Sequence, residues 1–411
     1  MSDFQFAVDL DRFVSGQPHD EFARLRREAP ISWNPLPKSR KKDDGFWLVT
    51  RHEDVVAASR NAAVFKSNEG TLLVDHPPAT APAPWSMIKN EFCSLDAPIH
   101  RTYRNLLAPK FTPRAIASME APMRALAQTQ ISAAYEKGSF DFSEALAVEF
   151  PTTVVLVQLL GLPEEDRHKA AYWSDVLSAP EDPHFKHAPD ATMRAVQEMY
   201  DYAIALVQSR RDEPRDDLAS VLAHTTLPDG SVLSDEMFTH YFWSMILGAF
   251  DTTAATIAGG ALALIQRPDT VRMLRDDPSL ISTAVEEMLR WVSAVVYFRR
   301  TASEDTTLGG QAIAKGDRVA LCYPSANRDE TVFEDPEVFD ITRNPNPHVS
   351  FGFGPHFCLG AHLARMELRI FFEVLLAQDD WLALGGEVRH ARSNFLNRIH
   401  TFPVTRTAWP R

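Results

Sequence analysis

One cysteine, Cys358, lies in the stretch FGFGPHFCLG, between a glycine-rich turn and a sequence with helical spacing. A thiolate is a nucleophile and a metal ligand, and the free N–H groups at a helix start favour this charged form. Glycines at positions 352, 354 and 360 lack a Cβ, so the main chain there can lie close to something flat and bulky. The apolar or strand-like surroundings of Cys93 and Cys322 predict small buried side chains without a chemical task.

A second group of reactive side chains lies in the most apolar part of the chain, LSDEMFTHYFWSMILGAFDTTAATIAGGALALIQRP. We expect one long buried helix here, capped by Ser234 and ended before Pro268. Asp251 and Thr252 are costly inside such a helix unless they have partners, because apolar surroundings solvate carboxylates and hydroxyls poorly. For Thr252, the alternative to a chemical role is a hydroxyl bonded to the carbonyl of the preceding turn.

The spacing Phe351-x-x-Gly354-x-x-x-Cys358-x-Gly360 resembles the haem-ligand loop of the cytochrome P-450 family. The resemblance implies that Cys358 binds the iron of haem b as a thiolate. A dinucleotide fingerprint would need a small residue where this chain has Phe357. The paired cysteines and histidine of covalent haem attachment are missing, so we expect non-covalent binding.

Further marks of the family follow in the same order over most of the chain. Glu287 and Arg290, in EEMLRW, match the family's Glu-x-x-Arg pair and share one helix face, with Arg343 as the third partner. The resemblance gives them a structural role, fixing the irregular segment beneath the haem loop. Without that context they would be read as an ordinary exposed ion pair.

Haem carries two propionates, which need cationic or hydrogen-bonding partners where they are partly buried. Four residues match the family positions that bind propionates: His100, Arg104, Arg300 and His356. Arg299 is the poorer match of its pair, because the family places the arginine two residues before an alanine, here Ala302. Taken singly, each would be read as a solvated charge or a histidine with an ordinary hydrogen bond.

The stretch LGAFDTTAAT resembles the family's oxygen-binding groove. The resemblance implies that Asp251 and Thr252 relay the protons that O–O cleavage consumes, while the thiolate favours that cleavage. Gly248 is small enough to leave space above the iron. Ala249 stands where the family usually has glycine, a departure that we expect to alter the shape of the groove more than the mechanism.

The chain has no flavin or nicotinamide fingerprint, so electrons must come from a separate protein. Family analogy implies a ferredoxin served by an NAD(P)H-dependent reductase. Four basic residues could form its docking patch around the sulfur side: Lys110, Arg114, Arg365 and Arg369. The alternative is that these side chains are ordinary solvated charges.

Family analogy also places substrate contacts at mainly apolar positions: Trp85, Met87, Ile88, Phe92, Met245, Gly248, Val295 to Phe298, Phe395 and Leu396. A hydrophobic pocket predicts a small or medium apolar substrate, such as a terpenoid, an alkylaromatic or a steroid-like molecule. The expected reaction is insertion of one oxygen atom of O2. Two alternatives are a peroxide-driven peroxygenase, which generally lacks the acid and alcohol pair, and a non-enzymatic haem-thiolate sensor.

Composition fits a folded soluble enzyme. The 411 residues are 45% hydrophobic and carry a formal charge of -13, which disfavours binding to nucleic acid and to anionic membranes. Three widely spaced cysteines and an acidic N-terminus without a signal-like segment predict a cytoplasmic protein. We expect no membrane span, because no apolar run approaches roughly 18 residues.

Hydrophobic periodicity predicts the elements that must position these residues. Helical patterns dominate from about residue 112 to 290, and strand-like segments occur at ISW, GFWLVT and TLGGQAIAKGDRVALCY. A proline-rich irregular segment runs from Arg328 to Pro347. The fold class predicted is mainly α with a minor β portion, the cytochrome P-450 fold, with residues 1–411 forming a single domain.

Overall fold

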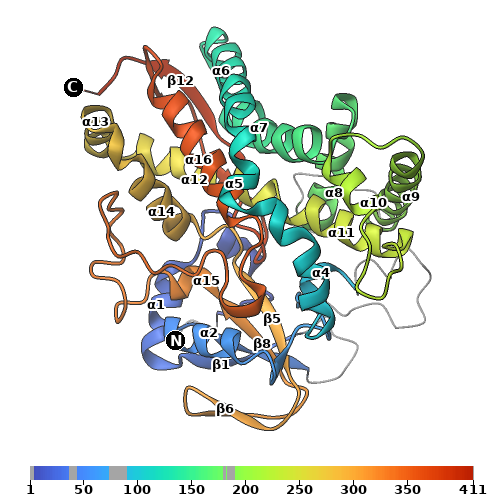
Figure 1. The fold of residues 1–411 in the computed structure, drawn as a ribbon. Coiled ribbons are helices and arrows are strands. Elements are labelled where there is room, and N and C mark those ends of the chain that lie inside the picture. Colours follow the sequence, from blue (N-terminus) through green and yellow to red (C-terminus); the bar gives the residue numbers. More distant parts are fainter. Residues whose placement is uncertain (1–3, 37–43, 74–89, 179–181, 183–189, 411) are drawn as a thin grey trace.

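The computed structural model describes residues 4–36, 44–73, 90–178, 182 and 190–410. Helices form the larger part of the molecule and the strands gather at its edges (Figure 1). This arrangement confirms the predicted fold class. The two ends of the chain lie on the same side of Figure 1, the N-terminus near the bottom and the C-terminus near the top.

The largest sheet joins segments from opposite ends of the sequence. Its order is β1-β2-β8-β5-β3, and only the pairing of β2 with β8 is parallel. The strands are β1 (Ile31–Pro35), β2 (Gly45–Val49), β3 (Phe65–Lys66), β5 (Tyr297–Ala302) and β8 (Arg318–Cys322). Two helices on this part of the chain are α1 (His19–Glu28) and α2 (His52–Arg60), and the hairpin of β6 (Thr306–Leu308) and β7 (Gln311–Ile313) extends below them in Figure 1. The predicted strands ISW and GFWLVT are therefore present.

Helices build the rest of the molecule around one large apolar cluster, in which aromatic side chains such as Phe150, Phe242 and Phe371 are fully buried. They are α4 (Ile99–Leu107), α5 (Pro113–Ile116), α6 (Glu120–Glu136), α7 (Glu149–Thr152), α8 (Arg167–Ser178), α9 (Ala191–Asp212), α10 (Leu218–Ala223), α11 (Asp235–Gly248), α12 (Asp251–Ile265), α13 (Pro268–Asp276), α14 (Ile281–Val292), α15 (Tyr323–Ala326) and α16 (Ala361–Leu376). The smaller sheets contain β4 (Ser139–Asp141), β9 (Trp381–Leu384) and β12 (Pro403–Thr407), and β10 (Arg389–His390) with β11 (Ile399–Thr401).

The prediction of one continuous helix from Ser234 to Pro268 is wrong at its centre. The Ser234 side chain does cap the start, accepting from Met237 N, but α11 ends at Gly248 and α12 begins at Asp251. At the break, the hydroxyls of Thr252 and Thr253 donate to the carbonyls of the residues four before them, Gly248 (3.1 Å) and Ala249 (3.3 Å). Such side-chain bonds compete with the backbone ladder and bend helices.

By length and composition alone, Asp235–Ile265 could cross a membrane, with a mean hydropathy of 1.3. However, 61% of this apolar window lies buried inside the protein, as in the core helix of a soluble protein. The segment therefore gives only weak evidence of a membrane span.

Candidate active site

The cysteine loop owes its shape to two glycines in the left-handed region. Gly352 and Gly354 have φ values of +70° and +71°, which side chains with a Cβ rarely adopt. A Cβ on Gly354 would lie 2.6 Å from the carbonyl oxygen of Ser59, at the end of α2. These glycines thus serve the turn and its close packing on α2.

The loop delivers Cys358 to the start of α16, as the sequence predicts. Its backbone N donates to Phe351 O (2.9 Å), and Cys358 keeps exposed surface. Protein atoms nevertheless crowd the sulfur, and this burial raises the pKa of the thiol; the backbone N–H of Gly360 and the charges of Arg104 and Arg365 act in the opposite direction. The helix start therefore favours the thiolate but does not produce it alone, whereas metal coordination deprotonates a thiol outright.

Two of the expected propionate ligands, His100 and His356, stack on each other with ring centroids 4.1 Å apart. Burial lowers the pKa of His100 to about 4 and that of His356 to about 2, so both rings are neutral near pH 7. One ring nitrogen of His356 lies 3.3 Å from Ser67 Oγ. His100 Nε2 is buried and has no hydrogen-bond partner among the described residues, as expected of an atom that awaits a ligand oxygen.

The two expected arginines approach the same region from α4 and β5. Arg104 Nη2 donates to the carbonyl of Phe357 (2.7 Å), directly before the cysteine, and Arg300 lies buried with Nη1 bonded to Arg299 O (2.8 Å). Arg299 instead donates to the carbonyls of Leu72 (3.1 Å) and Glu69. Its guanidinium is therefore engaged with the N-terminal part of the chain, which agrees with the choice of Arg300.

Beneath the loop, Glu287 and Arg290 form a pair with side chains 0% exposed. Arg290 Nη2 lies 2.7 Å from Glu287 Oε1, and Arg343 Nε lies 3.3 Å from Oε2. Arg290 also donates to three carbonyls of the irregular segment, those of residues 327, 336 and 338. The three predicted partners thus meet, and they fix that segment as expected.

Asp251 and Thr252 lie together at the start of α12, but each bonds elsewhere. Thr252 Oγ1 donates to Gly248 O, which is the alternative raised for it from the sequence. Asp251 is 0% exposed and accepts from Ser174 of α8 and from Arg398 Nη1 (3.2 Å). A Cβ on Gly248 would meet no described atom within 4 Å, so space is open beside the break.

The described substrate-contact positions include two sets of contacts, one between residues 295–298 and Phe395 and the other between Phe92 and α11. Val296 N donates to Phe395 O (2.8 Å), and the Phe298 and Phe395 rings lie 6.0 Å apart. Phe92 stacks on Tyr241 of α11 (5.7 Å). Trp85, Met87 and Ile88 lie outside the described residues.

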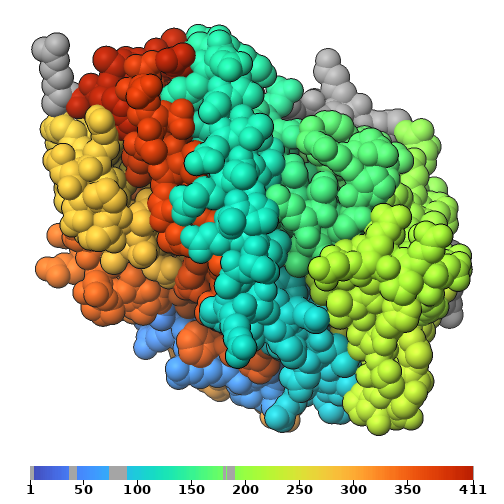
Figure 2. Space-filling model, turned by 45° about the horizontal axis from the view of Figure 1, so that its top comes forward, coloured from blue at the N-terminus to red at the C-terminus, as the bar shows by residue number. Residues whose placement is uncertain are grey.

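The predicted docking arginines are already engaged in ion pairs. Arg365 binds Glu286 with distances of 2.6 and 2.8 Å, and Arg369 pairs with Glu120 and Glu373 (3.0 Å each). Only the exposed Lys110 and Arg114 keep the surface position that was expected. In Figure 2 the surface of α4 to α6 runs down the middle of one face, beside that of the C-terminal segment that contains α16.

Sequence reasoning missed Arg398, the cation beside Asp251. It follows the substrate-contact positions and lies 147 residues from Asp251 along the chain. The only available signal was general: a buried carboxylate requires a cation or several donors.

Comparison with known proteins gives the family. A family model described as Cytochrome P450 matches residues 166–389. Linalool 8-monooxygenase of Pseudomonas putida is 36% identical over 96% of this chain and 97% of its own length. A steroid C26-monooxygenase of Rhodococcus jostii is 38% identical over 97% of this chain and 83% of its own.

A solved structure agrees with these matches. Mycobacterium marinum cytochrome P450 CYP268A2, in complex with pseudoionone, superposes with a TM-score of 0.87 at 37% identity, covering 94% of each chain. The chain belongs to the cytochrome P450 family. It is an oxidoreductase that uses thiolate-ligated haem b, O2 and redox partners to hydroxylate apolar molecules.

Proposed function

We propose that this chain is a ferredoxin-dependent monooxygenase in which Cys358 is the haem ligand, and that residues 1–411 work as one domain. The observation that carries the assignment is the buried Nε2 of His100, which has no hydrogen-bond partner in the described part of the chain. It lies beside His356, on the loop that presents Cys358. A propionate oxygen of bound haem would satisfy this atom, and the cations Arg104 and Arg300 would supply the opposite charge. The described residues therefore fit the group.

Bound haem supplies the activation of dioxygen, with thiolate donation favouring O–O cleavage. The residues of the chain supply the protons and the shape of the site. Asp251 holds a proton-accepting carboxylate at the start of α12, and the Thr252 hydroxyl passes protons on when it leaves the Gly248 carbonyl. The acid and alcohol pair favours a monooxygenase over a peroxygenase.

We propose an acyclic or monocyclic terpenoid, or a steroid side chain, as the substrate class. The names of the relatives support this choice, since they act on linalool and on the C26 position of steroids. The aromatic and aliphatic contacts between residues 295–298 and Phe395 suit a flexible apolar molecule. A cytoplasmic location is part of this proposal, supported by the three free cysteines, since disulfides form mainly in oxidising compartments.

A spectroscopic experiment tests the haem ligand. Cys358→Ser should lose the red-shifted band of the reduced carbon-monoxide complex, because a serine oxygen donates less charge to iron. Cys93→Ser, at a partly buried cysteine outside the loop, is the matched control and should keep the band. Retention of the band in Cys358→Ser would mean that another residue binds iron.

Substrate and donor need a second experiment. The ferric protein is titrated with monoterpene alcohols, steroids and branched fatty acids. The haem spectrum should shift most with the class of molecule that contains the substrate, which the proposal expects to be terpenoids or steroids. NAD(P)H- and ferredoxin-dependent oxygen consumption then separates a monooxygenase from a sensor, which would show no turnover with any donor.

A further inference from the structure

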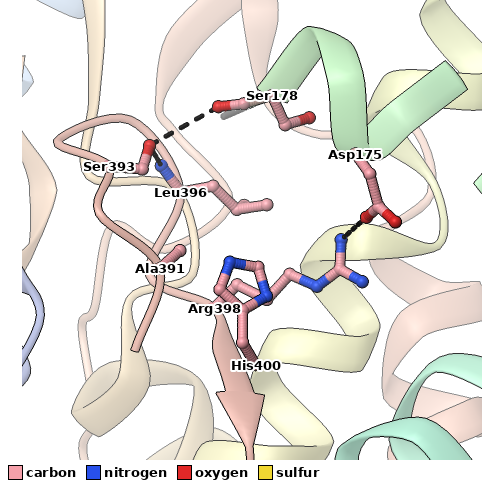
Figure 3. A pocket seen from close by; sticks show the side chains of 7 residues that line it. All are labelled: Asp175, Ser178, Ala391, Ser393, Leu396, Arg398 and His400. Atoms are coloured by element: carbon pink, nitrogen blue, oxygen red, sulfur yellow. Dashed lines mark hydrogen bonds and ion pairs between the residues drawn. The ribbon is translucent and has the colours of Figure 1, made fainter. Parts of the chain in front are cut away.

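A buried ionic cluster lies where α8, α12 and the segment between β10 and β11 meet, away from the cysteine loop (Figure 3). The residues that line it are Asp175, Ser178, Ala391, Ser393, Leu396, Arg398 and His400. Only about 10 Å³ is open to the centre of a water-sized sphere, which admits one water molecule but no organic substrate. The cluster is therefore too small to bind a substrate, and the interactions of its charged side chains are what remain to be explained.

Arg398 is the cation that joins two helices in this cluster. Its Nη1 lies 3.2 Å from Asp251 Oδ1 of α12 and also pairs with Asp175 of α8, as the dashed line in Figure 3 marks. The Arg398 side chain is 11% exposed and that of Asp251 0%. Neither charge can be solvated by bulk water, so each depends on the other.

The second oxygen of the same carboxylate is also held from α8. Ser174 Oγ donates to Asp251 Oδ2. Ser174 directly precedes Asp175, the aspartate of α8 that pairs with Arg398. A carboxylate has about four lone-pair positions, and these two bonds occupy two of them.

The electrostatics favour a charged pair. Burial acts to lower the pKa of Arg398, but the charges of Asp251 and Asp175 outweigh it and raise that pKa. Removing Arg398 would leave the fully buried Asp251 carboxylate without this cation, and a buried charge that loses its partner is costly and free to reorient.

We propose that Arg398 is a positioning residue for proton delivery, which holds the Asp251 carboxylate in one orientation by bridging it to Asp175 of α8. This inference rests on the proposed relay through Asp251 and Thr252. It adds a residue from the C-terminal segment to the machinery. It also makes proton delivery depend on the contact between α8 and α12.

The test compares Arg398→Gln and Arg398→Lys with a control in the same segment, Arg392→Gln. The Arg392 guanidinium pairs with Asp11, near the N-terminus. In the holoenzyme, Arg398→Gln should lower the product formed per NAD(P)H by roughly tenfold, about 1.4 kcal/mol of transition-state free energy, and raise the solvent isotope effect. Substrate affinity, read from the ferric spectrum, should change little. Arg398→Lys should recover much of the coupling, and Arg392→Gln should match the wild type.

A readout without turnover checks the pair itself. Denaturant unfolding of Arg398→Gln, Asp251→Asn and the double variant should be clearly non-additive, because each single change already removes the interaction. Additive losses would overturn the pairing. Should Arg398→Gln fail to fold, Asp175→Asn loosens the bridge from its other end and should lower coupling by a smaller factor.

The outcomes separate this inference from the proposed function. Full coupling in Asp251→Asn would overturn the relay itself. Loss of coupling in Asp251→Asn together with wild-type coupling and isotope effect in Arg398→Gln and Asp175→Asn would leave the relay standing and overturn the role of Arg398.

Discussion

Two buried polar side chains, Glu287 beneath the cysteine loop and His240 on α11, have opposite hydrogen-bond environments. Below the loop, Glu287 Oε1 accepts from Arg290 (2.7 Å) and from Asp340 N (2.8 Å), and Oε2 accepts from Arg290 (2.8 Å) and Asn346 (3.0 Å). By contrast, both ring nitrogens of His240 on α11 are buried without a hydrogen-bond partner among the described residues.

The difference indicates that the Glu287 network serves as a rigid support, whereas the pair of α11 and α12 can rearrange during function. A carboxylate that accepts four hydrogen bonds is fixed in one arrangement and helps to hold the ligand loop rigidly, since any loosening weakens the pairing of a buried charge. A helix pair with a break and under-bonded polar groups can change partners at lower cost, as segments that move in function generally do. The following changes test this contrast, from the largest expected effect on stability to the smallest.

Arg290→Leu should be the most damaging substitution, because it removes the buried cation that binds both oxygens of Glu287 and leaves the longer contact with Arg343 (3.3 Å) to offset that buried charge. We expect the free energy of unfolding to fall by about 3–5 kcal/mol, measured by denaturant titration. The control is Arg272→Leu, which removes an exposed pair with Asp269 and should cost no more than about 1 kcal/mol. Similar costs for the two changes would contradict the idea of a rigid support.

Gly354→Ala should have the next largest effect. Gly310 is a matched control, since its φ is +82° and a Cβ there would meet nothing within 4 Å, whereas one on Gly354 would strike Ser59 O. Both changes should cost about 1–2 kcal/mol for the left-handed backbone, and Gly354→Ala should cost more because the loop must move away from α2. Equal melting temperatures would show that the close approach is easily relieved.

His240 should make the protein sensitive to acid. Burial lowers its pKa from 6.5 to about 4. Between these values the unfolded chain binds the proton and the folded chain does not, so stability is lost as pH falls from 6.5 towards 4. The slope is at most about 1.4 kcal/mol per pH unit.

The measurement compares denaturant unfolding of wild type and His240→Gln at pH 7 and at pH 5. The variant should lose less stability than the wild type over this interval. Parallel losses would mean that His240 has a proton acceptor in the folded protein after all.

Thr252→Ala should change stability least, by less than about 1 kcal/mol, because the lost hydroxyl makes a local hydrogen bond to the carbonyl of Gly248, four residues earlier. Reductant use should continue while product formation becomes largely uncoupled. Thr253→Ala is the matched control, since it removes the neighbouring hydroxyl, bonded to Ala249 O. Equal uncoupling in both variants would assign the effect to the helix break instead of to a proton relay.

The structural features that could be predicted from the sequence are those that depend on residues close together in the chain. The cysteine loop, the Glu287 and Arg290 pair and the Ser234 cap each depend on residues within a few positions of one another, and the structure brings them together as predicted. The strand segments and the irregular segment before the loop were also recognisable, because proline and residue alternation act locally.

Pairings across the fold could not be predicted. Nothing near Arg398 indicates that its partner is Asp251, because that contact exists only after α8, α12 and the C-terminal segment have packed. For the same reason Arg365 resembled a free docking cation, although Glu286 neutralises it from α14. The helix break was hidden because Thr252 and Thr253 are compatible with an unbroken helical pattern.

The parallel pairing of β2 with β8 also sets an order of events during synthesis. Leu48 pairs with Ala320, about 270 residues later, so the large sheet cannot close until most of the chain has left the ribosome. At roughly 5–20 residues per second, the early strands wait on the order of tens of seconds for their neighbour. The cysteine loop is translated only shortly afterwards, so cofactor capture must come late and onto a nearly finished scaffold.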